Sequence, residues 1–240
     1  MTHNLENFDT DAGVSINEGL RSYMMSIYNY MFGGLIVTAL TAFIASRPSV
    51  LPLFFNITEN NIGFSLLGWI TLLAPFGLIF MFPSALREKN VGKAQFLFWT
   101  FSALIGVSCN TLVLSFSDAQ ITNAFVICGA MFAGMSLYGY TTKKDLSGVG
   151  SFMTMGLWGV ILACLVNLFL KSGTMNLVIS LITVVIFVGL TAYDTQKMRL
   201  LYREEDSKGN QVIAIFGALE LYLDFINLFR QILYLTSDRK

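Results

Sequence analysis

The stretch that decides the fold is GALELYLDFINLFRQILYL, residues 217–235. It is apolar and long enough to cross the hydrocarbon core of a bilayer as a helix, which takes about 20 residues. Two carboxylates, Glu220 and Asp224, stand four residues apart within it and would share one helix face. Because charged residues are costly inside a bilayer, they usually face the protein interior and mark ion paths or proton relays. The stretch therefore predicts a membrane helix that carries a buried polar site.

The composition of the whole chain supports a membrane protein. Of its 240 residues, 55% are hydrophobic and only 12% are charged, whereas soluble domains carry about 25% charged residues. The fifteen basic and fifteen acidic side chains cancel, which argues against a basic surface for nucleic acid. The composition indicates an all-α polytopic membrane protein.

Seven segments are long and apolar enough to span a bilayer. They are 22–46, 65–86, 94–117, 121–142, 148–170, 175–198 and 212–235. The connections between them are short, so neighbouring helices are expected to run antiparallel. We predict a polar, acidic tail over 1–21, a seven-helix transmembrane domain over 22–237 and a short tail over 238–240. The first tail lacks the basic start and short apolar core of a signal peptide.

Lysine and arginine are distributed unevenly between the two ends of these segments. One set of ends carries ten, namely Arg21, Arg87, Lys89, Lys93, Lys143, Lys144, Lys197, Arg199, Arg203 and Lys208. The opposite set carries four, namely Arg47, Lys171, Arg239 and Lys240. Cytoplasmic loops of membrane proteins are enriched in Lys and Arg. The N-terminus is therefore predicted to face the cytoplasm and the C-terminus the opposite side.

Metal and thiol chemistry have little support in the sequence. There is no CxxC pair, and the only histidine is His3 in the N-terminal tail. This argues against a zinc site or a Cys/His catalytic pair. Cys109, Cys128 and Cys164 lie within apolar segments and are expected to pack as small buried groups.

Two sequence features bear on helix packing. In GAMFAGMSLYGY, Gly129 and Ala133 fall one turn apart, and small residues allow membrane helices to approach closely. In the second segment, Pro75 and Pro83 each remove a backbone donor and can kink the helix. The second segment is therefore expected to bend most easily.

Topology brings the charged residues of the spans together. Asp194 lies near the end of the sixth segment, and Asp224 lies about 12 residues, or roughly 18 Å, into the seventh, which starts from the same surface. The depths match better if the sixth helix extends past Met198. Glu220 lies one turn nearer the cytoplasm than Asp224. We expect all three carboxylates to converge in the cytoplasmic half of the bundle.

Such a pair has a specific chemistry. Two carboxylates in a poorly solvated site cannot easily both be ionised, and they can hold one proton between them. Once both protons are lost, an arginine or a cation can neutralise the pair, and hard oxygen ligands suit Ca²⁺. This favours a proton-sensing pair, or a transient Ca²⁺ site, at Asp194 and Asp224. A purely structural cluster, with Glu220 reaching water, is the alternative.

Catalysis in the membrane is not expected. Intramembrane aspartyl proteases also place two aspartates on adjacent helices, but they carry a GxGD pattern, whereas Asp194 stands in AYDTQ and Asp224 in LYLDF. Rhomboid-type hydrolysis needs a Ser/His pair, and no predicted span contains a histidine. The sequence therefore predicts no enzyme and no permanently bound cofactor.

The stretches GLTAYDTQKM (189–198), GALELYLDFINLF (217–229) and MSLYGYTTKKDLS (135–147) resemble the Bax inhibitor-1 (transmembrane Bax inhibitor motif) family, in its bacterial branch. The resemblance covers the membrane portion from the first to the seventh segment. It implies a multi-pass protein of the bacterial inner membrane. It also implies a bundle with the last helix central, surrounded by the other six.

The resemblance also implies a function. Bacterial relatives are described as pH-sensitive calcium leak channels, gated by an aspartate pair that an arginine of the second helix latches. By motif, Asp194 and Asp224 match the pair, and Arg87 is the candidate for the latch. Glu220 and Arg230 depart from the pattern and could modulate the pair, Glu220 as a third carboxylate and Arg230 as a counter-charge. Family members are also described as modulators of other membrane proteins such as proteases, which is the alternative function.

Overall fold

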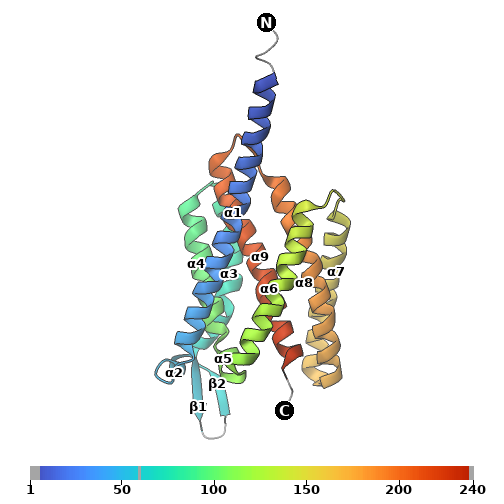
Figure 1. Ribbon diagram of the computed structural model, residues 1–240. Helices are drawn as coiled ribbons and strands as arrows, with labels where there is room; N and C mark the ends of the chain where they lie inside the picture. Colours follow the sequence, from blue (N-terminus) through green and yellow to red (C-terminus); the bar gives the residue numbers. More distant parts are fainter. Residues whose placement is uncertain (1–5, 59–60, 238–240) are drawn as a thin grey trace.

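The structure, a computed structural model, describes residues 6–58 and 61–237. Within these residues, the chain forms nine α-helices and one β-hairpin (Figure 1). The elements are α1 (Glu6–Ala45), α2 (Leu51–Phe54), β1 (Phe55–Thr58), β2 (Asn61–Phe64), α3 (Leu66–Arg87), α4 (Val91–Ser108), α5 (Asn110–Ser115), α6 (Asp118–Thr141), α7 (Ser147–Leu170), α8 (Gly173–Leu201) and α9 (Ser207–Thr236).

The seven predicted spans are confirmed. Within the described residues, seven helical segments are long and apolar enough to cross a membrane. They are 18–45, 66–87, 91–115, 118–141, 147–170, 173–201 and 207–236. The third span is broken at Cys109, which ends α4 and precedes α5. The sixth continues past Met198 to Leu201. This extension was expected, because it brings Asp194 closer to the membrane depth of Asp224.

The connection after the first span contradicts the expectation of a short loop. It holds α2 and the antiparallel hairpin β1–β2, in which Phe55 pairs with Phe64. Their ring centroids lie 5.2 Å apart. Phe64 also packs against Trp69 of α3, with ring centroids 5.5 Å apart. Stacked aromatic rings therefore hold the hairpin against the start of the second span.

The ends of several helices are set by polar side chains that accept hydrogen bonds from free backbone N–H groups. Ser65, Asn90 and Asp206 cap α3, α4 and α9 in this way. Ser117 and Gln120 form a reciprocal capping box at the start of α6. These residues interrupt the apolar runs, so they fix where each span begins.

The spans differ widely in burial. In α9, 67% of the residues in the most apolar window are buried, against 50% in α8 and 6% in α7. Helix α9 packs against α1, α3, α4, α6 and α8, and Figure 1 shows it passing between them. The arrangement of all six other spans around α9 stays a prediction. Large apolar side chains elsewhere, such as Phe80 and Phe169, point away from the bundle, where lipid would cover them.

Glycines allow the closest helix contacts, but not at the predicted position. A Cβ on Gly139 of α6 would lie 2.1 Å from the backbone oxygen of Ala192 in α8. A Cβ on Gly106 of α4 would meet the backbone of Thr38 in α1. Gly129 has open space where a Cβ would stand, so the prediction of a close approach there is wrong. Spacing finds small residues, but the crossing points of the helices decide which of them matter.

Helix α3 runs without interruption through both of its prolines. Because Pro75 has no N–H, the carbonyl of Thr71 loses its partner within the helix. The hydroxyl of Ser108, in α4, donates to the Thr71 carbonyl oxygen at 3.3 Å. A neighbouring helix thus satisfies the freed group, as an apolar environment requires.

The three cysteines were expected to be buried, and the structure confirms this only in part. Cys128 is buried and Cys109 is partly buried, but Cys164 is exposed on α7. The exposure of Cys164 follows from the position of α7, which turns most of its surface away from the other helices.

Candidate functional site

Asp194 and Asp224 meet where α8 packs against α9. The two carboxyl groups interact directly with each other. Asp224 is 4% exposed, and its Oδ2 atom has no hydrogen-bond partner among the described residues. A buried polar atom without a partner is costly. The structure therefore places a partly buried carboxyl group, that of Asp194, beside a buried and incompletely satisfied one, that of Asp224.

Glu220 does not join the pair as a third equal member. It forms an ion pair with Lys197 of α8, whose Nζ lies 2.7 Å from Oε1 and 3.0 Å from Oε2. The charges of both residues still act on Asp194 and Asp224. Within the described residues, no three acidic, His or Cys side chains come together as a group that could hold a metal ion. The expected convergence of three carboxylates is therefore only partial.

The two arginines singled out from the sequence lie apart from the pair. Arg87, at the end of α3, is exposed and forms no ion pair with a described residue. Arg230 lies further along α9, where it lines a cavity of about 290 Å³ together with Asn227 and Ser108. Among the described residues, Lys197 is the basic residue that forms an ion pair with one of the three carboxylates.

A chain of hydroxyl groups holds the helices next to the pair. Tyr28 Oη of α1 lies 2.6 Å from Ser136 Oγ of α6. Ser136 Oγ in turn lies 3.0 Å from Thr195 Oγ1 of α8. Because Thr195 directly follows Asp194, this chain fixes the part of α8 that carries the aspartate. The sequence reasoning missed it, since isolated Ser, Thr and Tyr residues carry no spacing signal.

A second polar contact fixes α9. Tyr222 is completely buried, and its hydroxyl lies 2.6 Å from Thr38 Oγ1 of α1. Thr38 Oγ1 also donates to carbonyl oxygens of Gly34 and Ser102. Since Tyr222 stands two residues before Asp224, the contact sets the rotation of α9 and hence the direction of its carboxylate.

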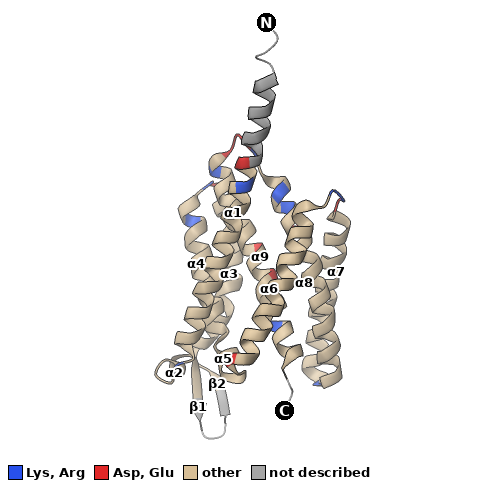
Figure 2. Cartoon of the chain, viewed as in Figure 1, with Lys and Arg blue, Asp and Glu red and all other residues tan. Residues whose placement is uncertain are grey.

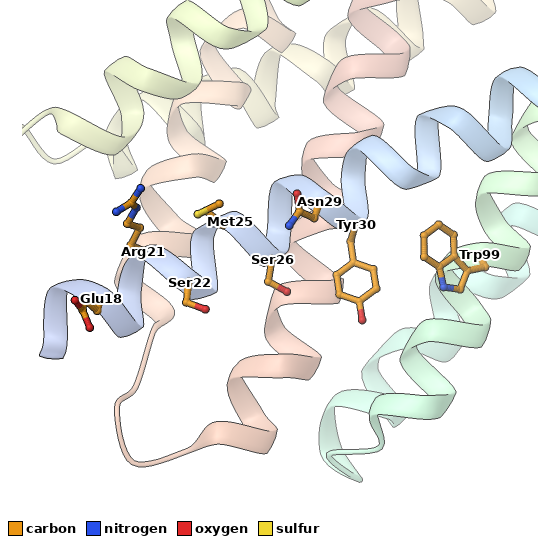
Figure 3. A pocket seen from close by; sticks show the side chains of 8 residues that line it. All are labelled: Glu18, Arg21, Ser22, Met25, Ser26, Asn29, Tyr30 and Trp99. Atoms are coloured by element: carbon orange, nitrogen blue, oxygen red, sulfur yellow. The ribbon is translucent and has the colours of Figure 1, made fainter.

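Two of the openings along α1 have linings rich in polar residues. The larger is a groove of about 710 Å³ along its outer face, lined by polar residues such as Ser22, Ser26 and Asn29 (Figure 3). The smaller has about 340 Å³ and lies between α1 and the start of α9. Only the smaller is lined by Tyr23, on which the charge of Glu220 acts. The smaller cavity therefore lies beside the buried Tyr23 and the start of α9, whereas the groove follows α1 and reaches Trp99 of α4.

The charges gather at one end of the bundle. Figure 2 shows most Lys and Arg residues at the end where α1 enters and where α8 joins α9. At this end, Lys89 Nζ binds Asp206 Oδ2 at 2.6 Å. This bond, and the backbone N–H of Gly209, hold the pKa of Asp206 below its usual value. The salt bridge connects the α3–α4 turn to the turn before α9.

Comparison with known proteins gives consistent results over almost the whole chain. Residues 20–240 match the sequence model of a family described as "Inhibitor of apoptosis-promoting Bax1". The chain is 41% identical over 233 residues to uncharacterized protein RP147 of Rickettsia prowazekii, covering 96% of this chain and 95% of the relative. It is 37% identical over 235 residues to inner membrane protein YbhL of Escherichia coli K12, covering 96% and 97%.

Proposed function

We propose, because the chain belongs to the Bax inhibitor-1 family and is a multi-pass protein of the inner membrane, that it is a pH-sensitive cation leak channel. Calcium is the proposed permeant ion, and Asp194 and Asp224 form the proposed gate. One observation carries the proposal: two carboxyl groups meet inside the bundle, and one oxygen of Asp224 has no described partner. The proposed role is transport and not catalysis.

The pair has the properties of a switch. With one shared proton, the two carboxyl groups attract each other and hold α8 against α9. When the charge on the pair changes, the balance between a closed and an open arrangement changes with it. A divalent cation could replace the proton, since carboxylate oxygens are hard ligands. A proton and a calcium ion would then compete for the same binding site, the Asp194–Asp224 pair.

The distribution of basic residues supports an orientation. The end where α3 turns into α4 and α8 joins α9 carries Lys89, Arg199 and Arg203, and it would face the cytoplasm by the positive-inside rule. The N-terminus would lie on that side, and seven spans would bring the C-terminus to the other. A reporter that is active only in the cytoplasm should work after Lys208 and fail after Lys240.

The channel is tested by calcium flux from liposomes that contain only the purified protein. Lowering the pH from about 8 to about 6, the range in which buried carboxylates exchange a shared proton, should change the flux. Asp194→Asn and Asp224→Asn should each abolish this pH response. The double variant should lose no more of the pH response than either single variant, because the pair acts as one unit. Asp145→Asn, in an exposed cytoplasmic-end turn, is the matched control and should keep the response.

Two outcomes would redirect the proposal. If both single variants fold and keep the full pH response, the carboxylates are structural. If the folded wild-type protein conducts no cations, the alternative role as a modulator that binds other membrane proteins is favoured, because a modulator need not work alone. Arg87→Ala tests the latch separately: a raised basal leak would show that Arg87 reaches the pair in another conformation.

A further inference from the structure

Four charged side chains stand within one turn of each other on two facing helices. Asp194 and Lys197 lie three residues apart on α8, and Glu220 and Asp224 lie four apart on α9, so each pair shares a helix face. The side chains of Lys197 and Glu220 are 34% and 21% exposed, whereas Asp224 is 4% exposed. The ion pair is therefore more exposed to water than Asp224, and Asp194 is partly buried.

A polar cavity opens at the basic end of the bundle, between α1 and the start of α9. The cavity of about 340 Å³ is lined by Ser22, Ser26, Tyr202 and Asn210, and by Tyr23 at its inner side. Tyr23 is 6% exposed, and its hydroxyl has no partner among the described residues. The cavity wall thus holds a second buried polar atom without a described partner, on a helix that packs against both α8 and α9.

Two buried polar atoms have no hydrogen-bond partner among the described residues. They are the hydroxyl of Tyr23 and Oδ2 of Asp224, which lies one turn from Glu220 on α9. Buried polar atoms normally find a partner in protein or water, so each of these two can take a water molecule or an ion as its partner. The three carboxylates do not form one metal-binding group within the described residues. A cation would therefore meet Glu220 first and the aspartates afterwards.

We propose that Glu220 is the cytoplasmic-side cation-binding residue of the route to the Asp194–Asp224 pair, and that Lys197 occupies it as a tethered cation. The inference rests on the proposed channel function. It specifies how cations reach the aspartate pair and how Lys197 blocks them. The ammonium of Lys197 contacts both oxygens of Glu220 and thus fills the position of an incoming cation. Its flexible stem lets it exchange partners, and its charge already acts on both aspartates.

Substitutions on the two sides of this ion pair should have opposite effects on calcium flux in liposomes. Lys197→Met removes the tethered cation and should raise the initial rate about two- to fivefold, the range that a partly exposed ion pair of up to about 1 kcal/mol allows. Glu220→Gln releases Lys197 towards the aspartates and should lower the rate. In a Lys197→Met background, Glu220→Gln should lower the rate less, because no lysine is left to release. Lys208→Met, an exposed lysine at the same end, is the matched control and should change nothing.

A second readout needs no channel. Terbium(III), a luminescent substitute for Ca²⁺, is titrated against the protein in detergent, with excitation through tyrosines such as Tyr23. Lys197→Met should bind terbium more tightly than the wild type, and adding Asp194→Asn and Asp224→Asn should remove this gain. If neither the wild type nor any variant leaks calcium but Lys197→Met binds terbium more tightly, the channel function fails and the cation route stands. If Lys197→Met raises neither flux nor binding, or shifts flux in the same direction as Glu220→Gln, the inference is overturned.

Discussion

Helices α7 and α9 are almost equally apolar and yet occupy opposite environments. In α7, 6% of the residues in the most apolar window are buried, and in α9 67% are. The difference follows from what each helix carries besides apolar residues. Helix α9 bears Glu220, Tyr222 and Asp224, which find partners only on other helices. Hydropathy places a helix in the membrane, and its polar side chains place it within the bundle.

The largest contrast is expected from shortening a leucine on each helix. Leu228 of α9 is fully buried, and Leu168 of α7 is 70% exposed. Leu228→Ala should lower the free energy of unfolding by about 2–5 kcal/mol, because packing contacts are lost and a cavity remains. Leu168→Ala should change it by less than about 0.5 kcal/mol. Reversible unfolding in mixed micelles measures both, and equal losses would show that α7 also packs against protein.

A smaller contrast is expected from removing one hydroxyl on each helix. The Tyr222 hydroxyl bonds across to α1, whereas Thr154 of α7 donates to Gly150 of its own helix. Tyr222→Phe should cost between about 0.6 and 1.7 kcal/mol, the range for hydrogen bonds between membrane helices. Thr154→Val should cost less, since the backbone bonds of α7 remain. The same unfolding assay separates the two, and a larger loss for Thr154→Val would contradict this assignment.

The smallest effect concerns the aspartates that precede the two helices, Asp145 before α7 and Asp206 before α9. Hydrogen bonds from Ser147 hold the pKa of Asp145 below its usual value, and the bond from Lys89 does the same for Asp206. A lowered pKa stabilises the fold above the unfolded value of 3.8, and this contribution is lost as the pH falls through the folded pKa. Both sites are exposed, so the effect on stability is small.

Lys89→Ala should therefore raise the pKa of Asp206 and leave that of Asp145 unchanged. The reason is that the partner of Asp206 comes from a distant turn, whereas the partner of Asp145 lies two residues along the chain. Carboxyl chemical shifts followed by NMR titration measure both values. A shift at Asp145 would mean that the two turns are coupled.

The sequence predicted the parts of this molecule that depend on local composition. All seven spans were found, because each needs about 20 apolar residues and nothing more. The association of Asp194 with Asp224 was also predictable, since topology and depth bring both to one half of the bundle. The hairpin at Phe55 and Phe64 was not predicted, because its two short strands are too brief for a clear alternating pattern.

Contacts that depend on helix rotation could not be predicted. Lys197 was counted only as a loop charge, although it stands three residues after Asp194 and so shares its face. That spacing was the one available signal for its ion pair with Glu220. Gly139, and not Gly129, meets a neighbouring backbone, because the crossing point of α6 and α8 is a property of the packed bundle.

The late position of α9 in the chain has a consequence for biosynthesis. The ribosome makes this helix after the other six spans, and Asp224 opposes its release into lipid by about 2.5–3.5 kcal/mol. The partners of its polar groups belong to helices that are already made: Asp194 for Asp224, Lys197 for Glu220 and Thr38 for Tyr222. Insertion of the last span therefore depends on the earlier helices, which must first associate and present the partners of its polar side chains.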